Sequence, residues 1–217
     1  MSVRGCSAHI SDNTPEVIIK VVSRGSNTLR AVQMHFEDLQ AGTLRSLETD
    51  FRCSRVVGKK AARALVEDWD LDLDALTSRI PHLSAVREAP TKLVHKLIFS
   101  MPAGTPPDKL LAAVRAFARS EYGPKHRYAL ALHTDDPNPH VHVVVRAISE
   151  EGKRLHIRKA TLRNWRMTYA RLLRSQMIAA KATRRWTPPK QRATFGFRGM
   201  LRPINGPPAV TWSGTRS

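Results

Sequence analysis

Three things are scarce in this sequence, and each excludes a class of protein. No apolar run approaches the roughly 20 residues that a membrane-spanning helix needs, and no apolar stretch follows a basic start, so we expect neither membrane insertion nor a signal peptide. The only two cysteines, Cys6 and Cys53, lack metal-ligand spacing, which favours reduced thiols in a cytoplasmic protein. After Glu151 there is no acidic residue, so the last part of the chain carries basic charge alone.

Basic residues dominate the charge that is present. The 217 residues include 36 Lys and Arg against 18 Asp and Glu, which gives a formal net charge of +18. Such an excess repels itself and is usually offset by a polyanionic partner. Nucleic acid is the first candidate and an anionic membrane surface is the second. A basic run can also be a solvated face or a disordered tail, but the one-sided charge after Glu151 favours nucleic-acid contact.

The length suits one domain with a tail, and 41% hydrophobic residues suffice for a core. Residues 1–14 are polar, and we predict that they are disordered. Residues 15–183 are predicted to form the domain. Residues 184–217 are rich in Pro, Gly and Arg, which predicts a basic tail with little fixed structure.

Local patterns predict a mixed fold. Short β-branched or apolar runs predict strands at residues 16–22, 92–100, 127–133, 140–148 and 155–157. Helical spacing of apolar residues predicts helices at residues 28–39, 59–69, 73–80, 107–122 and 161–180, the last capped by Thr161. This order indicates an α+β fold, and we expect a central antiparallel sheet of about five strands with flanking helices on one face.

The most informative segment is LHTDDPNPHVHVVV, residues 132–145. Alternate side chains of a strand point to the same face, so His140 and His142 project together. His133 ends the preceding strand, and a short hairpin loop would bring it beside that pair. Three imidazoles from neighbouring strands can hold one side of a metal ion and leave the other side open, as a catalytic site requires. Scattered surface histidines are the alternative, but three within ten residues in strand phase favour a metal site.

The residues around these histidines suit the same interpretation. Asp135 and Asp136 can accept a hydrogen bond from a ligand's second ring nitrogen, or attract a cation through their charge. A bound cation withdraws charge from a phosphate oxygen and stabilises the transition state of phosphodiester cleavage. A basic protein with an open three-histidine site therefore points to phosphodiester chemistry.

The segment from His133 to Val145 also resembles a known motif, H-x-D-x-x-x-P-H-x-H-x-x-V, at every fixed position. This is the motif of conjugative relaxases, the MobA/VirD-like mobilisation nucleases of the histidine-hydrophobe-histidine superfamily. Further segments are similar to that family, including KLVHKLIFSMPAGTPP at 92–107 and EGKRLHIRKATLRNWR at 151–166, and the resemblance covers about residues 14–185.

The resemblance implies a function, a cofactor and partners. It implies a domain that binds origin-of-transfer DNA, single-stranded at the nick, and cuts one strand by metal-dependent transesterification for mobilisation of a plasmid or mobile element. His133, His140 and His142 would hold Mg²⁺ or Mn²⁺, and Asp135 would orient a ligand or help to deprotonate the nucleophile. The fold implied is a five-stranded antiparallel sheet with flanking helices. Accessory proteins of the relaxosome and a type IV secretion coupling protein are further partners.

One position departs from the family pattern. In relatives the nucleophilic tyrosine lies on the first helix after the first strand, where this chain reads HFEDL at residues 35–39 and Asp38 takes the tyrosine's place. The only tyrosines are Tyr122, Tyr128 and Tyr169, and we expect each to be a packing residue. Asp38 stays a candidate nucleophile because a carboxylate can attack phosphorus.

Other residues are candidates for DNA contact or for the core. Basic side chains late in the chain are expected to contact phosphates, and they are Arg154, Arg158, Lys159, Arg163, Arg166, Arg184 and Arg185. Trp165 and Tyr169 are expected to pack on the sheet, with base stacking as the alternative. His95 is expected to be a core histidine.

Three hypotheses remain open on the sequence alone. The first is an active relaxase. The second is a degenerate relaxase that binds metal and DNA without cutting, because the expected tyrosine is missing. The third is a basic accessory protein in which the histidines have no role.

Overall fold

The computed structural model describes residues 14–22, 27–40, 47–49, 55–56, 59–73 and 92–182. All of them belong to one compact unit, Met1–Arg185. Their helices and strands follow the order β1 (Ile18–Val22), α1 (Leu29–Gln40), β2 (Leu47–Thr49), β3 (Arg55–Val56), α2 (Lys59–Asp68), β4 (Val94–Ser100), α4 (Pro107–Glu121), β5 (Tyr128–His133), β6 (His140–Arg146) and α5 (Lys159–Ser175). No described helix is long and apolar enough to cross a membrane.

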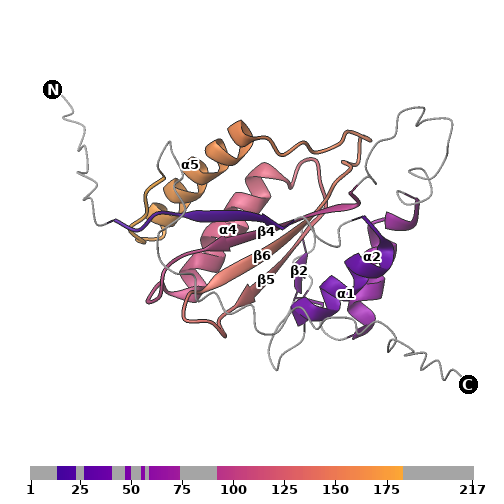
Figure 1. Cartoon of the computed structure of the whole chain (residues 1–217), viewed down its shortest axis with the longest axis horizontal. Helices are drawn as coiled ribbons and strands as arrows, with labels where there is room; N and C mark the ends of the chain where they lie inside the picture. The colour runs from indigo at the N-terminus through magenta and orange to yellow at the C-terminus, as the bar shows by residue number, and fades with distance from the viewer. Residues whose placement is uncertain are drawn as a thin grey trace, which may run out of the picture. The chain divides into compact units, whose positions relative to one another are not determined.

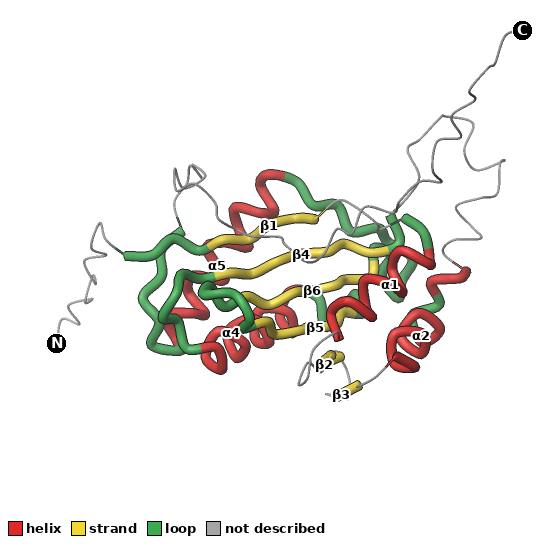
Figure 2. The backbone as a smooth tube through the Cα atoms, turned by 60° about the horizontal axis from the view of Figure 1, so that its bottom comes forward, coloured by secondary structure: helices red, strands yellow, loops and turns green. Residues whose placement is uncertain are grey.

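The described strands form one sheet, and Figure 1 labels its central strands β4, β6 and β5. The full strand order, β1-β4-β6-β5-β2-β3, can be followed in Figure 2. Every neighbouring pair is antiparallel. This confirms the predicted α+β class with an antiparallel sheet. The sheet has six described strands, or five when the two-residue β3 at its edge is set aside. The sequence did not predict β2 or β3, because runs of three and two residues are too short to show an alternating pattern.

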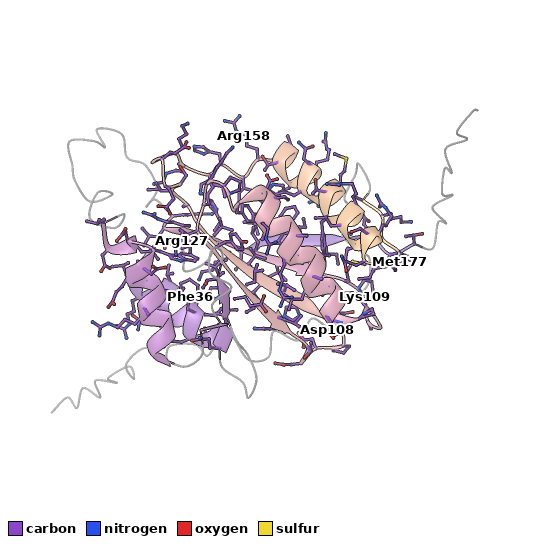
Figure 3. The ribbon with its side chains drawn as sticks, turned by 180° about the vertical axis from the view of Figure 1, so that it is seen from behind. Phe36, Asp108, Lys109, Arg127, Arg158 and Met177 are labelled. Carbon is purple, nitrogen blue, oxygen red and sulfur yellow. The ribbon has the colours of Figure 1, made fainter. Side chains whose placement is uncertain are left out.

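One face of the sheet, here called the helix face, carries the core. Leu97 and Phe99 of β4 and Val141 and Val143 of β6 are at most 1% exposed, and they alternate along their strands. They belong to the same core cluster as the buried sides of α4 and α5, which lie side by side in front of the sheet in Figure 3. Burying each such side chain contributes about 1.5–3 kcal/mol, so this layer carries much of the stability of the fold.

The opposite face, here called the histidine face, is covered in part by α1. Figure 2 shows α1 lying in front of the strands, on the side away from α4 and α5. The His35 ring of α1 lies 6.3 Å from the His142 ring of β6, measured between centroids. Helices therefore cover both faces, and the prediction that they lie on one face is wrong. The reason is that apolar residues such as Ile98 and Val144 also point to the histidine face and need cover.

The layer of α1 and α2 is held by aromatic and ionic contacts. Phe36 of α1 packs edge-on against Trp69, just after α2, at 5.5 Å between ring centroids, and both side chains are fully buried. Arg127, which precedes β5, forms an ion pair with Asp68 at the end of α2 (Figure 3). These contacts fix α1 over the sheet, so its inward-facing side chains have defined positions.

Two predictions near α5 are wrong. Residues 155–157 form no strand, because β6 ends at Arg146 and only an isolated bridge joins Ile148 to Arg154. The helix expected at 161–180 spans Lys159–Ser175. Thr161 is its third residue, and its hydroxyl accepts a hydrogen bond from the Arg158 N–H, so the helix begins earlier than expected. The predicted helix at 73–80 lies almost wholly outside the described residues.

The core yields a stability prediction. Phe117 of α4 is fully buried, with ring centroids at 5.0 Å from Phe99 and 6.0 Å from Trp165. We expect Phe117→Ala to lower the free energy of unfolding by about 3–5 kcal/mol, because it leaves a cavity between sheet and helices. Urea denaturation measures this, with Met167→Ala as control because Met167 on α5 is 51% exposed. Equal losses in the two variants would show that the Phe117 ring is not part of the core.

Candidate metal centre

Strand register brings three histidines together on the histidine face. His133, the last residue of β5, is the direct cross-strand partner of His140, the first residue of β6. His142 lies two residues along β6 and therefore points to the same side. The ring centroids are 5.4 Å apart for His133 and His140, 4.5 Å for His133 and His142, and 5.1 Å for His140 and His142. We call this group the histidine triad.

The triad has the donor set of a metal site. Its ligand nitrogens all lie within 4.8 Å of one another, and it is the only such group of His, Cys, Asp or Glu among the described residues. His133 and His142 are each 5% exposed. Buried imidazoles that converge in this way suit a divalent transition metal. Ser100 of β4 pairs with His140, and its buried hydroxyl has no hydrogen-bond partner within the described part of the chain, so it offers a further polar group to an occupied site.

Backbone carbonyls orient two of the three rings. His140 Nδ1 lies 3.1 Å from the carbonyl oxygen of Asn138, and His133 Nε2 lies 3.4 Å from the carbonyl oxygen of Leu39 in α1. A ring nitrogen that donates to a carbonyl leaves the other nitrogen with a free lone pair, which is the form that binds a metal. The sequence suggested Asp135 and Asp136 for this orienting role. Both are exposed on the loop between β5 and β6, and a role for Asp135 stays a prediction.

Two residues that the sequence interpretation missed lie beside the triad. His35 of α1 faces His142, and burial, with the nearby charges of Lys96 and His133, lowers its pKa to about 3. Lys96 of β4 is 5% exposed and points to the histidine face, because it pairs with Val144 two residues beyond His142. Burial lowers the pKa of Lys96 to about 8, and the nearby Asp38 carboxylate opposes this shift.

Weak signals for both residues were present in the sequence. Val32, Phe36 and Leu39 are the buried residues of α1, and His35 lies at helical spacing from Val32 and Leu39, on the inward side. Lys96 interrupts the apolar run of β4, and a charged residue in a strand with a buried pattern is a reason to look for a function. Neither signal indicates which residues His35 and Lys96 lie beside, because these contacts join elements that are far apart in the sequence.

Asp38 lies one helical turn beyond His35 and is exposed. Burial by its neighbours raises the pKa of its carboxyl, while the charge of Lys96 opposes that rise. Asp38 is thus close to Lys96, and its role as a nucleophile stays a prediction.

The three tyrosines lie in the core on the other side of the sheet. Tyr122 and Tyr169 are fully buried and Tyr128 is 5% exposed, and all three belong to the core cluster of the helix face. Burial raises the pKa of the Tyr122 and Tyr169 hydroxyls well above the usual range. The expectation that these tyrosines are packing residues is therefore confirmed, and the sheet separates them from the triad.

Trp165 and Tyr169 also have the core positions expected of them, whereas His95, expected in the core, is only half-buried. Trp165 is 1% exposed, and its Nε1 donates a hydrogen bond of 2.6 Å to Glu121. Because Trp165 and Tyr169 are buried, neither offers a surface for stacking bases. His95 is half-buried, its Nε2 lies 3.0 Å from the Leu155 carbonyl oxygen, and burial lowers its pKa to about 4.

The predicted DNA-contact residues that the structure describes lie apart from the triad. Arg158, Lys159 and Arg163 are exposed around the beginning of α5, which packs on the helix face, and Figure 3 labels Arg158 there. Arg154 donates to the carbonyl of Lys92, just before β4, whereas the triad lies level with the end of β4 at Ser100. Arg166 is half-buried on α5. Arg184 and Arg185 lie outside the described residues.

The fold and this site define an α+β domain with a three-histidine cluster on one sheet face. The sequence profile of the relaxase nuclease domain, MobA/VirD2-like, matches residues 53–178, which is more than half of the chain. The chain therefore belongs to the MobA/VirD2-like relaxase family. The matched residues include the histidine triad but not α1, where the family's nucleophile was expected.

Solved structures give the following likenesses. One, described as the molecular basis of vancomycin resistance transfer in Staphylococcus aureus, has a TM-score of 0.47 and 13% identity, and the match covers 78% of this chain and 98% of the other. The metal-bound conjugative relaxase TrwC in complex with oriT DNA has a TM-score of 0.45 and 14% identity, with 74% and 69% covered. No curated protein matches the chain.

The triad yields a prediction about metal binding. We expect His142→Ala to weaken Mn²⁺ binding on the order of 100-fold or more, because it removes one of three nitrogens from the site. Calorimetric titration of Mn²⁺ measures the loss. His156→Ala is the matched control, since His156 is exposed and is not a member of the triad, and it should bind as the unmodified chain does. Unchanged affinity in His142→Ala would remove the metal-site hypothesis.

Lys96 yields a prediction about stability and pH. Its pKa of about 8 in the folded chain lies below the usual lysine value of 10.5, so burying the ammonium destabilises the fold at neutral pH. We expect Lys96→Met to raise the free energy of unfolding by about 1–3 kcal/mol at pH 7. Between pH 8 and 10.5 the unmodified chain releases this proton on folding and gains stability, so the difference should shrink over that window.

Denaturant melts across this pH range test the prediction. Lys109→Met is the control, because Lys109 on α4 is exposed (Figure 3) and its loss should leave stability and its pH dependence nearly unchanged. A Lys96→Met variant that is less stable than the unmodified chain at pH 7 would contradict the buried-charge interpretation.

Proposed function

We propose that this chain binds origin-of-transfer DNA and nicks one strand by metal-dependent transesterification, in the cytoplasm, during mobilisation of a plasmid or mobile element. The observation that carries the proposal is the convergence of three imidazoles on one sheet face. Membership of the relaxase family and the net charge of +18 support it, because the substrate is a polyanion.

His133, His140 and His142 would hold the divalent ion. Three nitrogen donors favour Mn²⁺ over Mg²⁺, because Mg²⁺ prefers oxygen ligands. When bound, the ion would withdraw charge from a phosphate oxygen and so favour attack on the phosphorus. The hairpin of β5 and β6 fixes two of the donors as direct cross-strand partners, so the site is preorganised by the sheet.

Residues of this chain would position the DNA strand. The Lys96 ammonium points to the triad's face and would attract the phosphate next to the one that is cut. Asp135, exposed on the loop before His140, would orient a ligand or accept a proton. We assign the more distant phosphates to the basic residues of the late chain, which are Arg154, Arg158, Lys159, Arg163, Arg166, Arg184 and Arg185. Relaxosome accessory proteins and a type IV secretion coupling protein are proposed as further partners.

A degenerate relaxase that binds metal and DNA without cutting is the second candidate. One observation favours it: the tyrosine position on α1 holds Asp38, and all three tyrosines are buried on the opposite side of the sheet. A binding domain of this kind would retain its affinity for the origin but leave both strands intact.

A nicking assay separates the two candidates. We expect the full chain with Mn²⁺ to convert a supercoiled plasmid carrying its cognate origin into relaxed DNA with protein attached at one 5′ phosphate. His140→Ala should lower the rate of nicking on the order of 1000-fold or more, because the phosphate loses the charge of the metal ion. Binding of the origin should persist. His156→Ala serves as the control with an exposed histidine changed. A gel shift of origin DNA without any nick would favour the degenerate relaxase.

A further inference from the structure

His35 lies where a nucleophile on α1 would meet a phosphate held at the triad. Its ring faces His142 at 6.3 Å between centroids and an interplanar angle of 66°. The same helix also reaches His133, whose Nε2 lies 3.4 Å from the Leu39 carbonyl oxygen. No other described residue of α1 has a recorded ring contact with the triad.

His35 stands outside the ligand set. The triad is the only described group whose ligand atoms lie within 4.8 Å of one another, and it does not include His35. A nitrogen that is next to the site but free of the ion keeps its lone pair for another task. Attack on a phosphate bound beside the triad is a task that this position suits.

The helix that carries His35 is anchored on both sides of it. Phe36 is fully buried against Trp69, and the carbonyl of Leu39 lies 3.4 Å from His133 Nε2. A nucleophile needs to be held close to its productive geometry by its supporting residues, and these contacts supply that support.

Other nucleophiles are placed less well. Asp38 is exposed on α1, whereas His35 is half-buried with its ring against His142. Ser100 lies beside His140, but its hydroxyl has no hydrogen-bond partner within the described part of the chain, so no base activates it as a nucleophile. The tyrosines belong to the helix face.

We propose that His35 is the nucleophile of this relaxase and becomes covalently attached to the 5′ phosphate of the nicked strand, an inference that rests on the proposed function. One ring nitrogen donates its lone pair to phosphorus and forms a P–N bond, while the P–O3′ bond breaks and its electron pair goes to O3′. The other ring nitrogen releases its proton, which Asp38 or water can carry, and O3′ takes up one proton. The products are a phosphoramidate and a 3′-hydroxyl, and the reverse reaction rejoins the strand.

The linkage itself provides the test. A phosphoramidate of histidine is cleaved by dilute acid and survives alkali, an acyl phosphate of aspartate is cleaved by hydroxylamine and alkali, and a tyrosine phosphodiester survives acid. The full chain is incubated with Mn²⁺ and origin plasmid, and the protein–DNA adduct is isolated. We expect an adduct that dilute acid releases and that peptide mass mapping places on His35.

Variants of α1 complete the experiment. His35→Gln should lower the yield of adduct on the order of 1000-fold or more, while Mn²⁺ affinity and binding of origin DNA stay within about twofold of the unmodified chain, because His35 is not a ligand. Met34→Ala is the control on the same helix, because Met34 is 51% exposed, and it should still form the acid-labile adduct. An adduct that survives acid, maps to another residue or persists in His35→Gln overturns the assignment to His35 and leaves the relaxase function standing. A chain that binds the origin and never nicks it overturns the proposed function, and the role of His35 with it.

Discussion

The register between β5 and β6 is the constraint on which the site depends. Because His133 and His140 are direct cross-strand partners, and because side chains alternate along a strand, His142 must join them on the same face. A slip of one residue would turn these imidazoles toward α4 and α5, into the apolar core. The core residues Val141 and Val143 alternate with the histidines, so the packing that stabilises the fold also fixes the direction of the three rings.

The two faces of the sheet have different roles: the helix face stabilises the fold, and the histidine face carries the candidate site. The helix face is filled by aliphatic and aromatic residues of the strands, α4 and α5. The histidine face buries Lys96, Ser100, His133 and His142, which are polar groups that cost free energy to desolvate. Such a cost is usual at a functional site, where buried polar side chains are positioned to bind a ligand and not to pack in the core. The tyrosines illustrate the division, because all three lie on the stabilising side.

Much of the fold and the centre of the site followed from the sequence, because their signals are local. The alternation of His140, Val141, His142 and Val143 fixes a strand and its two faces, and the triad followed from it. The contributions of His35 and Lys96 could not be read in this way, because each depends on contacts between segments far apart in the sequence. His35 reaches the triad through the packing of α1 over β6, and Lys96 through the pairing of β4 with β6. Local patterns also missed that α1 covers the second face, since an amphipathic helix shows that it is buried but not against which surface. Short strands such as β2, with three residues, lie below the length at which periodicity is visible.

The carbonyl of Leu39 is directed at His133 from the last turn of α1, which has a consequence for how such a domain can change. The C-terminal end of a helix carries partial negative charge, so α1 adds an attraction for cations to the site through its backbone, whatever its side chains are. Ion binding and the reactive group therefore depend on different parts of the domain. The β5–β6 hairpin and the C-terminal end of α1 bind the ion, and the side chains of one turn of α1 provide the reactive group. Exchange of a few residues in α1 can therefore alter the chemistry of the domain while its sheet, its core and its histidine motif stay the same.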